Sequence, residues 1–192
     1  MTTTSRRRRT ARQQDLLDRL VRLVEAEGFA DFTLDDLAAR LRCSKTTLYA
    51  LAGSKHELVV EAVREYFRQA VPQVEARVAD AAPGERVTAY LLAVAEYLRP
   101  LSRAFLDDLL DYRPTADIYR SNTVAAAGRI RELIAEGIES GAFRAVNAAF
   151  VAEVVAATME KIQRGEMFAR LGMTDAEAYA ELASFVVDAL RD

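Results

Sequence analysis

A chain of 192 residues with 8 glycines, 4 prolines and 1 cysteine has a helix-favouring composition and cannot build an intrachain disulfide framework. No apolar run approaches the roughly 20 residues that span a bilayer, and no apolar segment follows the N-terminal arginines, so we expect a cytoplasmic protein without a membrane partner. The net charge is −3, yet residues 1–60 carry 11 basic and 8 acidic side chains and residues 61–192 carry 15 and 21. This asymmetry suggests that only the N-terminal part meets a polyanion, although an ordinary solvated surface explains it equally well.

Residues 1–9 are polar and basic, and we expect them to form a flexible arm. A helix follows, because Thr10 and Gln13 have the spacing of a capping box and apolar residues then recur at helical spacing. Gly28 marks the end of this helix, as is typical of the residue after a C-cap.

Two helix-start patterns come next in quick succession. Thr33 is expected to cap one short helix, and Ser44 a second helix over residues 45–51. Residues 41–43 form the connection between them. Two short helices joined by a three-residue turn match the helix-turn-helix pattern.

The rest of the chain predicts five or six longer helices and shows no strand-like alternation or internal repeat. Their expected bounds are Ser54 to near Ala79 with a bend at Pro72, from Pro83-Gly84 to before Pro100, roughly 101–112, from Pro114 to Gly141, from Asn147 to Gln163, and from Thr174 onward. The predicted fold is all-α, with the arm at 1–9, a three-helix helix-turn-helix domain at 10–58 and a larger C-terminal helical domain at 59–192.

The segment TLDDLAARLRCSKTTLYALAGSKHEL, residues 33–58, resembles the DNA-binding signature of the TetR family of transcriptional regulators. The resemblance is strong over residues 10–60. It is weaker toward the C-terminus, where IRELIAEGIESGAF followed by two helices is similar to the family's ligand-binding and dimerisation region. It implies a homodimer that binds a pseudo-palindromic, double-stranded operator and responds to a small molecule.

The chemistry of residues 44–51 also suits a recognition helix. Major-groove readout needs short polar and basic groups near a helix N-terminus, and free N–H groups at helix starts can bind phosphate. The expected DNA contacts are Thr33, Arg42, Ser44, Lys45, Thr46, Thr47, Tyr49, Ser54 and Lys55. By the family pattern, Lys45 and Thr46 face base edges, while Thr33, Thr47, Tyr49 and Lys55 hold phosphates.

Three positions depart from the family pattern. Arg42 replaces the usual turn glycine, at a cost of about 1 kcal/mol if its φ is positive, whereas a wider turn would avoid that cost. Leu51 stands where an aromatic residue or histidine commonly contacts phosphate. Ala52 replaces a phenylalanine, so the core beneath the next helix must be refilled. These departures bear on DNA affinity.

The basic arm offers a further set of contacts, Arg6, Arg7, Arg8 and Arg9, to a minor groove or to phosphates. A disordered, solubilising tail is the alternative. If the arm binds, each neutralised phosphate steepens the salt dependence by roughly 0.9 in log–log slope.

Apolar stripes on the last two helices predict a dimeric four-helix bundle, as the resemblance implies. The expected interface residues are Val151, Val154, Val155, Thr158, Ile162, Tyr179, Leu182, Val186 and Leu190. The alternative is that they form the core of a monomer.

Aromatic residues of the middle helices, Phe105, Tyr112 and Tyr119, suit an apolar effector pocket with a few hydrogen bonds, and Tyr90 and Tyr97 lie seven residues apart on an earlier helix. At helical spacing they also suit an ordinary core.

We expect no catalytic residue, metal or cofactor. His56 lies in a first helical turn, Cys43 has no second cysteine, and Asp107 and Asp108 point to different faces. The sequence therefore predicts a regulator, a repressor by family expectation, controlled by a small apolar or amphipathic effector. The alternatives are a small-molecule-binding or scaffold protein with weakened DNA binding and, more distantly, a helical enzyme.

Overall fold

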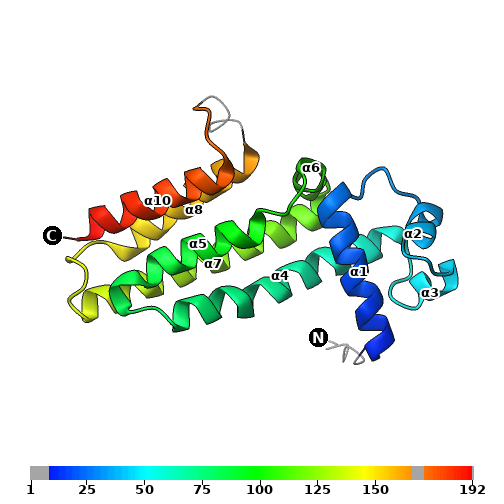
Figure 1. Cartoon of the computed structure of the whole chain (residues 1–192), viewed down its shortest axis with the longest axis horizontal. Helices are drawn as coiled ribbons and strands as arrows, with labels where there is room; N and C mark the ends of the chain where they lie inside the picture. The colour runs from blue at the N-terminus through cyan, green and yellow to red at the C-terminus, as the bar shows by residue number, and fades with distance from the viewer. Residues whose placement is uncertain (1–8, 166–170, 192) are drawn as a thin grey trace.

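A computed structural model describes residues 9–165 and 171–191, and this part of the chain contains helices and turns without a strand. The all-α prediction is confirmed (Figure 1). The helices are α1 (Ala11–Glu27), α2 (Leu34–Arg40), α3 (Lys45–Tyr49), α4 (Lys55–Ala79), the 3-10 turn η1 (Pro83–Glu85), α5 (Arg86–Leu98), α6 (Arg103–Asp111), α7 (Arg113–Glu139), α8 (Ala148–Arg164) and α10 (Asp175–Leu190). None of these helices is long and apolar enough to cross a membrane.

The first three helices begin at the residues expected from the sequence. Thr10 and Thr33 form complete capping boxes, with Gln13 and Asp36 respectively, and Ser44 caps α3. Helix α3, the helix expected to contact DNA, is shorter than predicted and ends at Tyr49. The N–H of Leu51 bonds to the carbonyl of Leu48, so the chain tightens into an i→i−3 turn instead of continuing the helix.

Helix α4 joins the two parts of the molecule. Its first half contributes Leu58, Val63 and Tyr66 to a core shared with α1, α2 and α3, whereas Val74 and Val78 belong to the core of the C-terminal part. The expected domain boundary at residue 58 thus falls inside a continuous helix that passes Pro72 without ending. A displacement of α4 would therefore act on both parts.

The C-terminal part packs α5, α7, α8 and α10 around one apolar core, with α8 and α10 side by side (Figure 1). Asn147 caps α8, and Thr174 forms a complete capping box with Glu177 at α10, as predicted. Six residues expected at a dimer interface lie in this core and are buried within the single chain: Val155, Ile162, Tyr179, Leu182, Val186 and Leu190. A side chain already buried has no surface left for a partner, so for these six the structure corrects the expectation toward the monomer-core alternative.

Helix α6 ties the two parts together. Asp108 accepts hydrogen bonds from the N–H groups of Phe29 and Ala30, and Phe105 packs edge-on against the ring of Phe29. The N–H of Ser102 also donates to the carbonyl of Glu25 at 2.9 Å. The loop between α1 and α2 is therefore held by a helix of the C-terminal part.

Candidate DNA-binding surface and effector cavity

The turn between α2 and α3 is built on a strained residue. Arg42 has φ 51°, the one positive φ at a non-glycine position in the described part of the chain. Its N–H bonds to the carbonyl of Ala39, and the N–H of Cys43 bonds to that of Ala38, which is the Schellman pattern of a helix end. Arg19 of α1 adds a bond from Nη1 to the carbonyl of Leu41 at 2.9 Å. The tight, positive-φ turn is confirmed, and the wider alternative is not adopted.

Helix α3 presents a polar face outward and one apolar anchor inward. Leu48 is fully buried, whereas Lys45, Thr46 and Tyr49 are exposed, Tyr49 to 49 %. Thr47 is half-buried because its hydroxyl lies 2.8 Å from that of Ser44. A helix fixed by one buried leucine can thus enter a groove with three outward side chains.

Two lysines expected to bind DNA are engaged within the protein. Nζ of Lys45 lies 2.7 Å from a carboxylate oxygen of Asp35, and this hydrogen bond and charge raise the pKa of Lys45. Nζ of Lys55 donates to the carbonyl of Ala30 at 2.7 Å, which links the start of α4 to the loop that Asp108 holds. Asp35 was not identified from the sequence, because spacing alone does not reveal a contact between two helices.

The caps at Thr33 and Ser54 are also occupied by acidic side chains. Asp36 accepts from both the N–H and the hydroxyl of Thr33, and these bonds lower the pKa of Asp36. Ser54 accepts from the N–H of Glu57, but the carboxylate of Glu57 bonds to the N–H of Gly53 rather than of Ser54. At Ser54 only one of the two hydrogen bonds of a capping box is therefore formed.

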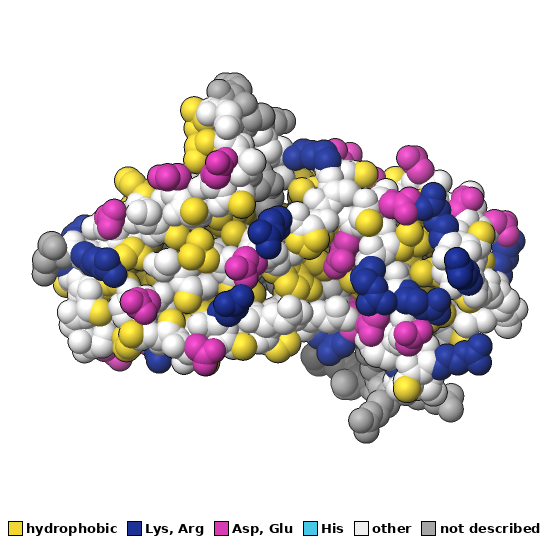
Figure 2. All heavy atoms as spheres, in the orientation of Figure 1, with side chains coloured by type: hydrophobic (Ala, Val, Ile, Leu, Met, Phe, Trp, Pro, Cys, Tyr) yellow, Lys and Arg dark blue, Asp and Glu magenta, His cyan; other side chains and the backbone are white. Residues whose placement is uncertain are grey.

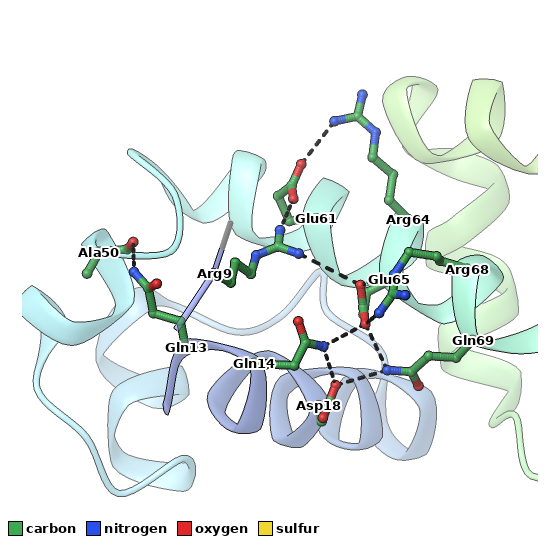
Figure 3. Close-up of polar contacts among 10 residues, drawn as sticks. All are labelled: Arg9, Gln13, Gln14, Asp18, Ala50, Glu61, Arg64, Glu65, Arg68 and Gln69. Atoms are coloured by element: carbon green, nitrogen blue, oxygen red, sulfur yellow. Dashed lines mark hydrogen bonds and ion pairs between the residues drawn. The ribbon is translucent and has the colours of Figure 1, made fainter. Parts of the chain in front are cut away.

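Arg9, the root of the basic arm, is bound to α4 (Figure 3). Its guanidinium pairs with Glu61 and lies 3.8 Å from Oε2 of Glu65. Glu65 is only 2 % exposed, and hydrogen bonds, first from Arg68 and then from Gln69 and Gln14, lower its pKa to about 2. Arg6, Arg7 and Arg8 lie outside the described residues.

The departures Leu51 and Ala52 border a hollow. It measures about 700 Å³ and is lined by the starts of α1 and α4 and by the residues after α3. Gln13 spans one side of it, with Nε2 bonded to the carbonyl of Ala50 at 3.1 Å (Figure 3). Both residues are half-buried and pack against the N-terminal core.

A second cavity, of about 380 Å³, lies between α4, α5, α7 and α8. Tyr119 lines it, and so do Tyr90 and Tyr97. Phe105 and Tyr112 do not, because Phe105 is fully buried in the N-terminal core and the ring of Tyr112 packs against His56 and Phe29. Sequence spacing thus indicated α5 and α7 correctly, but α6, which carries Phe105, does not line the cavity.

A buried polar chain closes one side of this cavity. Tyr119 donates from its hydroxyl to the Gln163 side chain, whose Nε2 donates to the hydroxyl of Tyr179 at 2.9 Å. Among the other tyrosines that line the cavity, the hydroxyl of Tyr97 donates to the carbonyl of Tyr66 at 2.9 Å. Burial raises the pKa of Tyr119 and of Tyr90 to about 12, so both hydroxyls stay neutral near pH 7.

Apolar side chains remain uncovered on the outer faces of α8 and α10. Phe150 is 67 % exposed and Phe185 71 %, with Val154 also exposed and Val151 and Thr158 half-buried. Figure 2 shows basic and acidic side chains gathered over the end formed by α1–α3, and yellow hydrophobic ones along the helical body. Within the described residues no group of His, Cys, Asp and Glu is arranged to hold a metal ion.

Comparison with known proteins agrees with a helix-turn-helix in the N-terminal part of the chain. The family model described as bacterial regulatory proteins, tetR family, matches residues 16–62. The N-terminal part of the chain, from α1 to the start of α4, is thus similar to the TetR family. The uncharacterized HTH-type transcriptional regulator YvaF of Bacillus subtilis is 36 % identical over 100 residues, which are 50 % of this chain and 52 % of that protein. The chain thus spans about half the length of this curated relative.

Solved structures show that the TetR-like fold extends over nearly the whole chain. A transcriptional regulator from Cytophaga hutchinsonii has a TM-score of 0.77 at 13 % identity, covering 95 % of this chain and 100 % of its own. A TetR transcription regulator from Haloarcula marismortui has a TM-score of 0.77 at 20 % identity, with 94 % and 98 % covered. A putative transcriptional regulator from Saccharomonospora viridis in complex with choline has a TM-score of 0.76 at 18 % identity, with 96 % and 100 % covered.

Proposed function

We propose that this chain is a cytoplasmic, homodimeric repressor of the TetR family that binds a pseudo-palindromic operator and is controlled by a small apolar or amphipathic effector. The observation that carries the DNA-binding part is the outward face of α3, where Lys45, Thr46 and Tyr49 surround a single buried leucine. Arg42 adds an exposed guanidinium at the adjoining turn, without an ion pair to any described residue. A basic, polar helix start of this kind suits the major groove.

Fluorescence anisotropy with the DNA upstream of the chain's own gene tests this part. Submicromolar, sequence-selective binding is expected. Lys45→Ala should weaken it by about tenfold, because a good base contact is worth roughly 1–3 kcal/mol. Arg131→Ala, which removes one exposed positive charge from α7, is the matched control and should leave binding unchanged. Weak binding that is indifferent to sequence would contradict the proposal.

One group of observations favours the alternative, a small-molecule-binding protein of the same fold with weakened DNA binding. Carboxylates already engage Lys45 and Arg9, and Leu51 and Ala52 stand where the family has aromatic contacts. The same titration separates the two functions. A chain that binds small molecules but shows no selective DNA complex at low salt supports the alternative.

We propose that two copies pair through the outer faces of α8 and α10. The exposed Phe150, Val154 and Phe185 are large apolar groups facing solvent, which marks a protein–protein contact when they lie together on paired helices. Of the residues expected from the sequence, Val151, Val154 and Thr158 remain able to take part. In a two-fold dimer the recognition helices would meet half-sites about one helical turn apart.

The cavity between α4, α5, α7 and α8 is the proposed effector site, because it is apolar, ringed by tyrosines and lined by the helix that continues into the DNA-binding domain. An effector that changes the position of α4 would change the spacing of the two recognition helices and so lower operator affinity.

Deletion of the gene tests whether the chain represses or activates. Expression from the upstream promoter should rise when the gene is deleted. A fall would indicate an activator.

A further inference from the structure

The cavity between α4, α5, α7 and α8 has a negative lining. Its charged side chains are the carboxylates of Glu75, Glu132 and Glu160 and the guanidinium of Arg129, so its formal charge is −2. Arg164, outside the lining, pairs with Oε1 of Glu160 at 2.7 Å and offsets part of that charge. The rest of the lining is aliphatic and aromatic, with some neutral polar groups.

Arg129 already forms ion pairs with carboxylates. Its Nε lies 3.0 Å from Oε1 of Glu75 and its Nη2 lies 3.1 Å from Oε2 of the same residue. Its Nη1 donates to Glu132 at 3.1 Å and to Glu136 at 3.3 Å. An anionic headgroup would therefore have to displace a carboxylate to reach this cation, and among the described residues the lining offers no other.

Tyrosine rings surround the space. Tyr66, Tyr90, Tyr97 and Tyr119 all contribute to the lining. Tyr90 is only 7 % exposed, and its hydroxyl makes no hydrogen bond to a described residue, although Glu75 is close enough to help raise its pKa. The faces of tyrosine rings attract cations, so these rings favour a positively charged ligand.

Gly128 gives the cavity part of its volume. It lies inside α7 and lines the cavity, and a Cβ built there would meet no heavy atom within 4 Å. Glycine within a helix costs about 1 kcal/mol relative to alanine. Glycine at position 128 thus leaves the cavity open beside α7 and lowers the stability of that helix.

Resting on the proposed effector site, we propose that the effector is an apolar molecule that carries one positive charge, an amine or a quaternary ammonium. Its apolar body lies against Phe67, Val94 and Leu98, and its charge lies among the tyrosine rings near Glu75 and Glu160. Burying a cation here is compensated by carboxylates and ring faces, whereas burying an anion would add repulsion to the loss of hydration.

Isothermal titration calorimetry with three probes of equal chain length tests the class: decyltrimethylammonium, decyl sulfate and decanol, each below its micelle concentration. The cation should bind at least about tenfold more tightly than the other two, as one desolvated cation–ring contact and a nearby carboxylate allow. Equal or tighter binding of the sulfate or the alcohol, or no binding of any probe, overturns the proposal.

One variant locates the binding. Gly128→Leu should abolish binding of the cation while the protein stays folded, because the added side chain enters open space. Cation binding that survives Gly128→Leu would place the probe elsewhere and overturn the proposal. The unfolding midpoint, followed by circular dichroism, reports the folded state of each variant.

The charge variants test the recognition itself. Glu75→Gln removes a carboxylate and releases part of Arg129, so it should weaken binding of the cation and strengthen binding of decyl sulfate. Glu160→Gln should weaken binding of the cation without disturbing Arg129. Glu139→Gln, at the exposed end of α7 and outside the lining, is the control and should change neither. An unchanged preference in both test variants contradicts the proposal.

The proposed ligand class and the proposed function are tested by separate experiments, so either one can be contradicted without the other. Calorimetry on the protein without DNA decides the class, whatever the chain does at a promoter. Anisotropy on upstream DNA without any probe decides DNA binding. A chain that binds the cation selectively but never binds DNA keeps the ligand class and loses the repressor function.

Discussion

At the scale of single residues, the turn at Arg42 is where the structure decides between two alternatives that the sequence left open. Arginine in place of the turn glycine allowed either a strained positive φ or a wider turn, and the structure has φ 51° there. The contact of Lys45 with Asp35 could not be predicted in the same way, because it depends on the angle between α2 and α3. The backbone conformation of a turn depends on residues that are neighbours in the sequence. The contact of Lys45 with Asp35 depends instead on how two helices pack.

Arg42→Gly should stabilise the protein by about 1 kcal/mol, because glycine adopts positive φ without the steric cost of a Cβ. The free energy of unfolding in urea measures this. The same variant should weaken DNA binding, since it removes an exposed guanidinium beside the recognition helix. Destabilisation would show that the arginine side chain contributes more to the fold than its strained backbone costs.

Asp35→Asn should increase operator affinity several-fold, because it releases Lys45 and removes one negative charge from the DNA-facing surface. Asp80→Asn, which makes the same charge change at the far end of α4, is the control. Fluorescence anisotropy at two salt concentrations gives both affinities. If the two variants behave alike, only net charge matters and the pairing with Lys45 is irrelevant to binding.

At the scale of helices, the residues at which helices begin could be predicted from the sequence. The polar side chains that become buried between helices could not. Thr10, Thr33, Ser44, Asn147 and Thr174 all cap helices as expected. The sequence did not identify Glu65, which lies almost fully buried on α4 beside Gln14 of α1 and Arg9. A glutamate in a helix is expected at the surface until the neighbouring helix is placed.

Glu65 should make stability depend on pH. Its folded pKa, about 2, lies below the ordinary 4.5, so the stabilisation is fully present above about pH 5 and is lost as pH falls toward 2. Glu65→Gln should therefore cost at most roughly 3 kcal/mol at pH 7, and the difference from wild type should shrink between pH 5 and pH 3. Urea unfolding at each pH measures it. Glu139→Gln, at an exposed site, should show no such trend.

Gly128→Ala should raise the free energy of unfolding by about 1 kcal/mol in the protein without effector, because alanine favours helix and its Cβ meets open space. Thermal unfolding followed by circular dichroism tests this. A lower midpoint would mean that the backbone at residue 128 needs glycine for a reason other than cavity volume.

At the scale of the whole molecule, the all-helical architecture and its two parts were predictable, but the dimer surface was only partly so. Helical periodicity identifies an apolar stripe without saying which partner covers it. Tyr179 and Leu182 are covered by the chain's own helices, whereas Phe150 and Phe185, absent from the expected interface, face outward. Deciding between core and interface needed the packing of α8 and α10 on α5 and α7.

Val154→Glu combined with Phe185→Glu should convert the dimer to a folded monomer, because both side chains are exposed in the single chain and a charge would be buried on pairing. Sedimentation velocity measures the state. Val124→Glu, at an exposed site on α7, is the control and should remain dimeric. A wild-type chain that sediments as a monomer would refute the interface.

A footprint on the upstream DNA tests whether a dimer binds DNA through two copies of α3. We expect two protected half-sites about one helical turn apart. Protection should need about tenfold more protein in Lys45→Ala. It should disappear in the monomeric Val154→Glu, Phe185→Glu variant and survive unchanged in Arg131→Ala. An upstream region without protection at low salt, or protection that the monomeric variant retains in full, would contradict it.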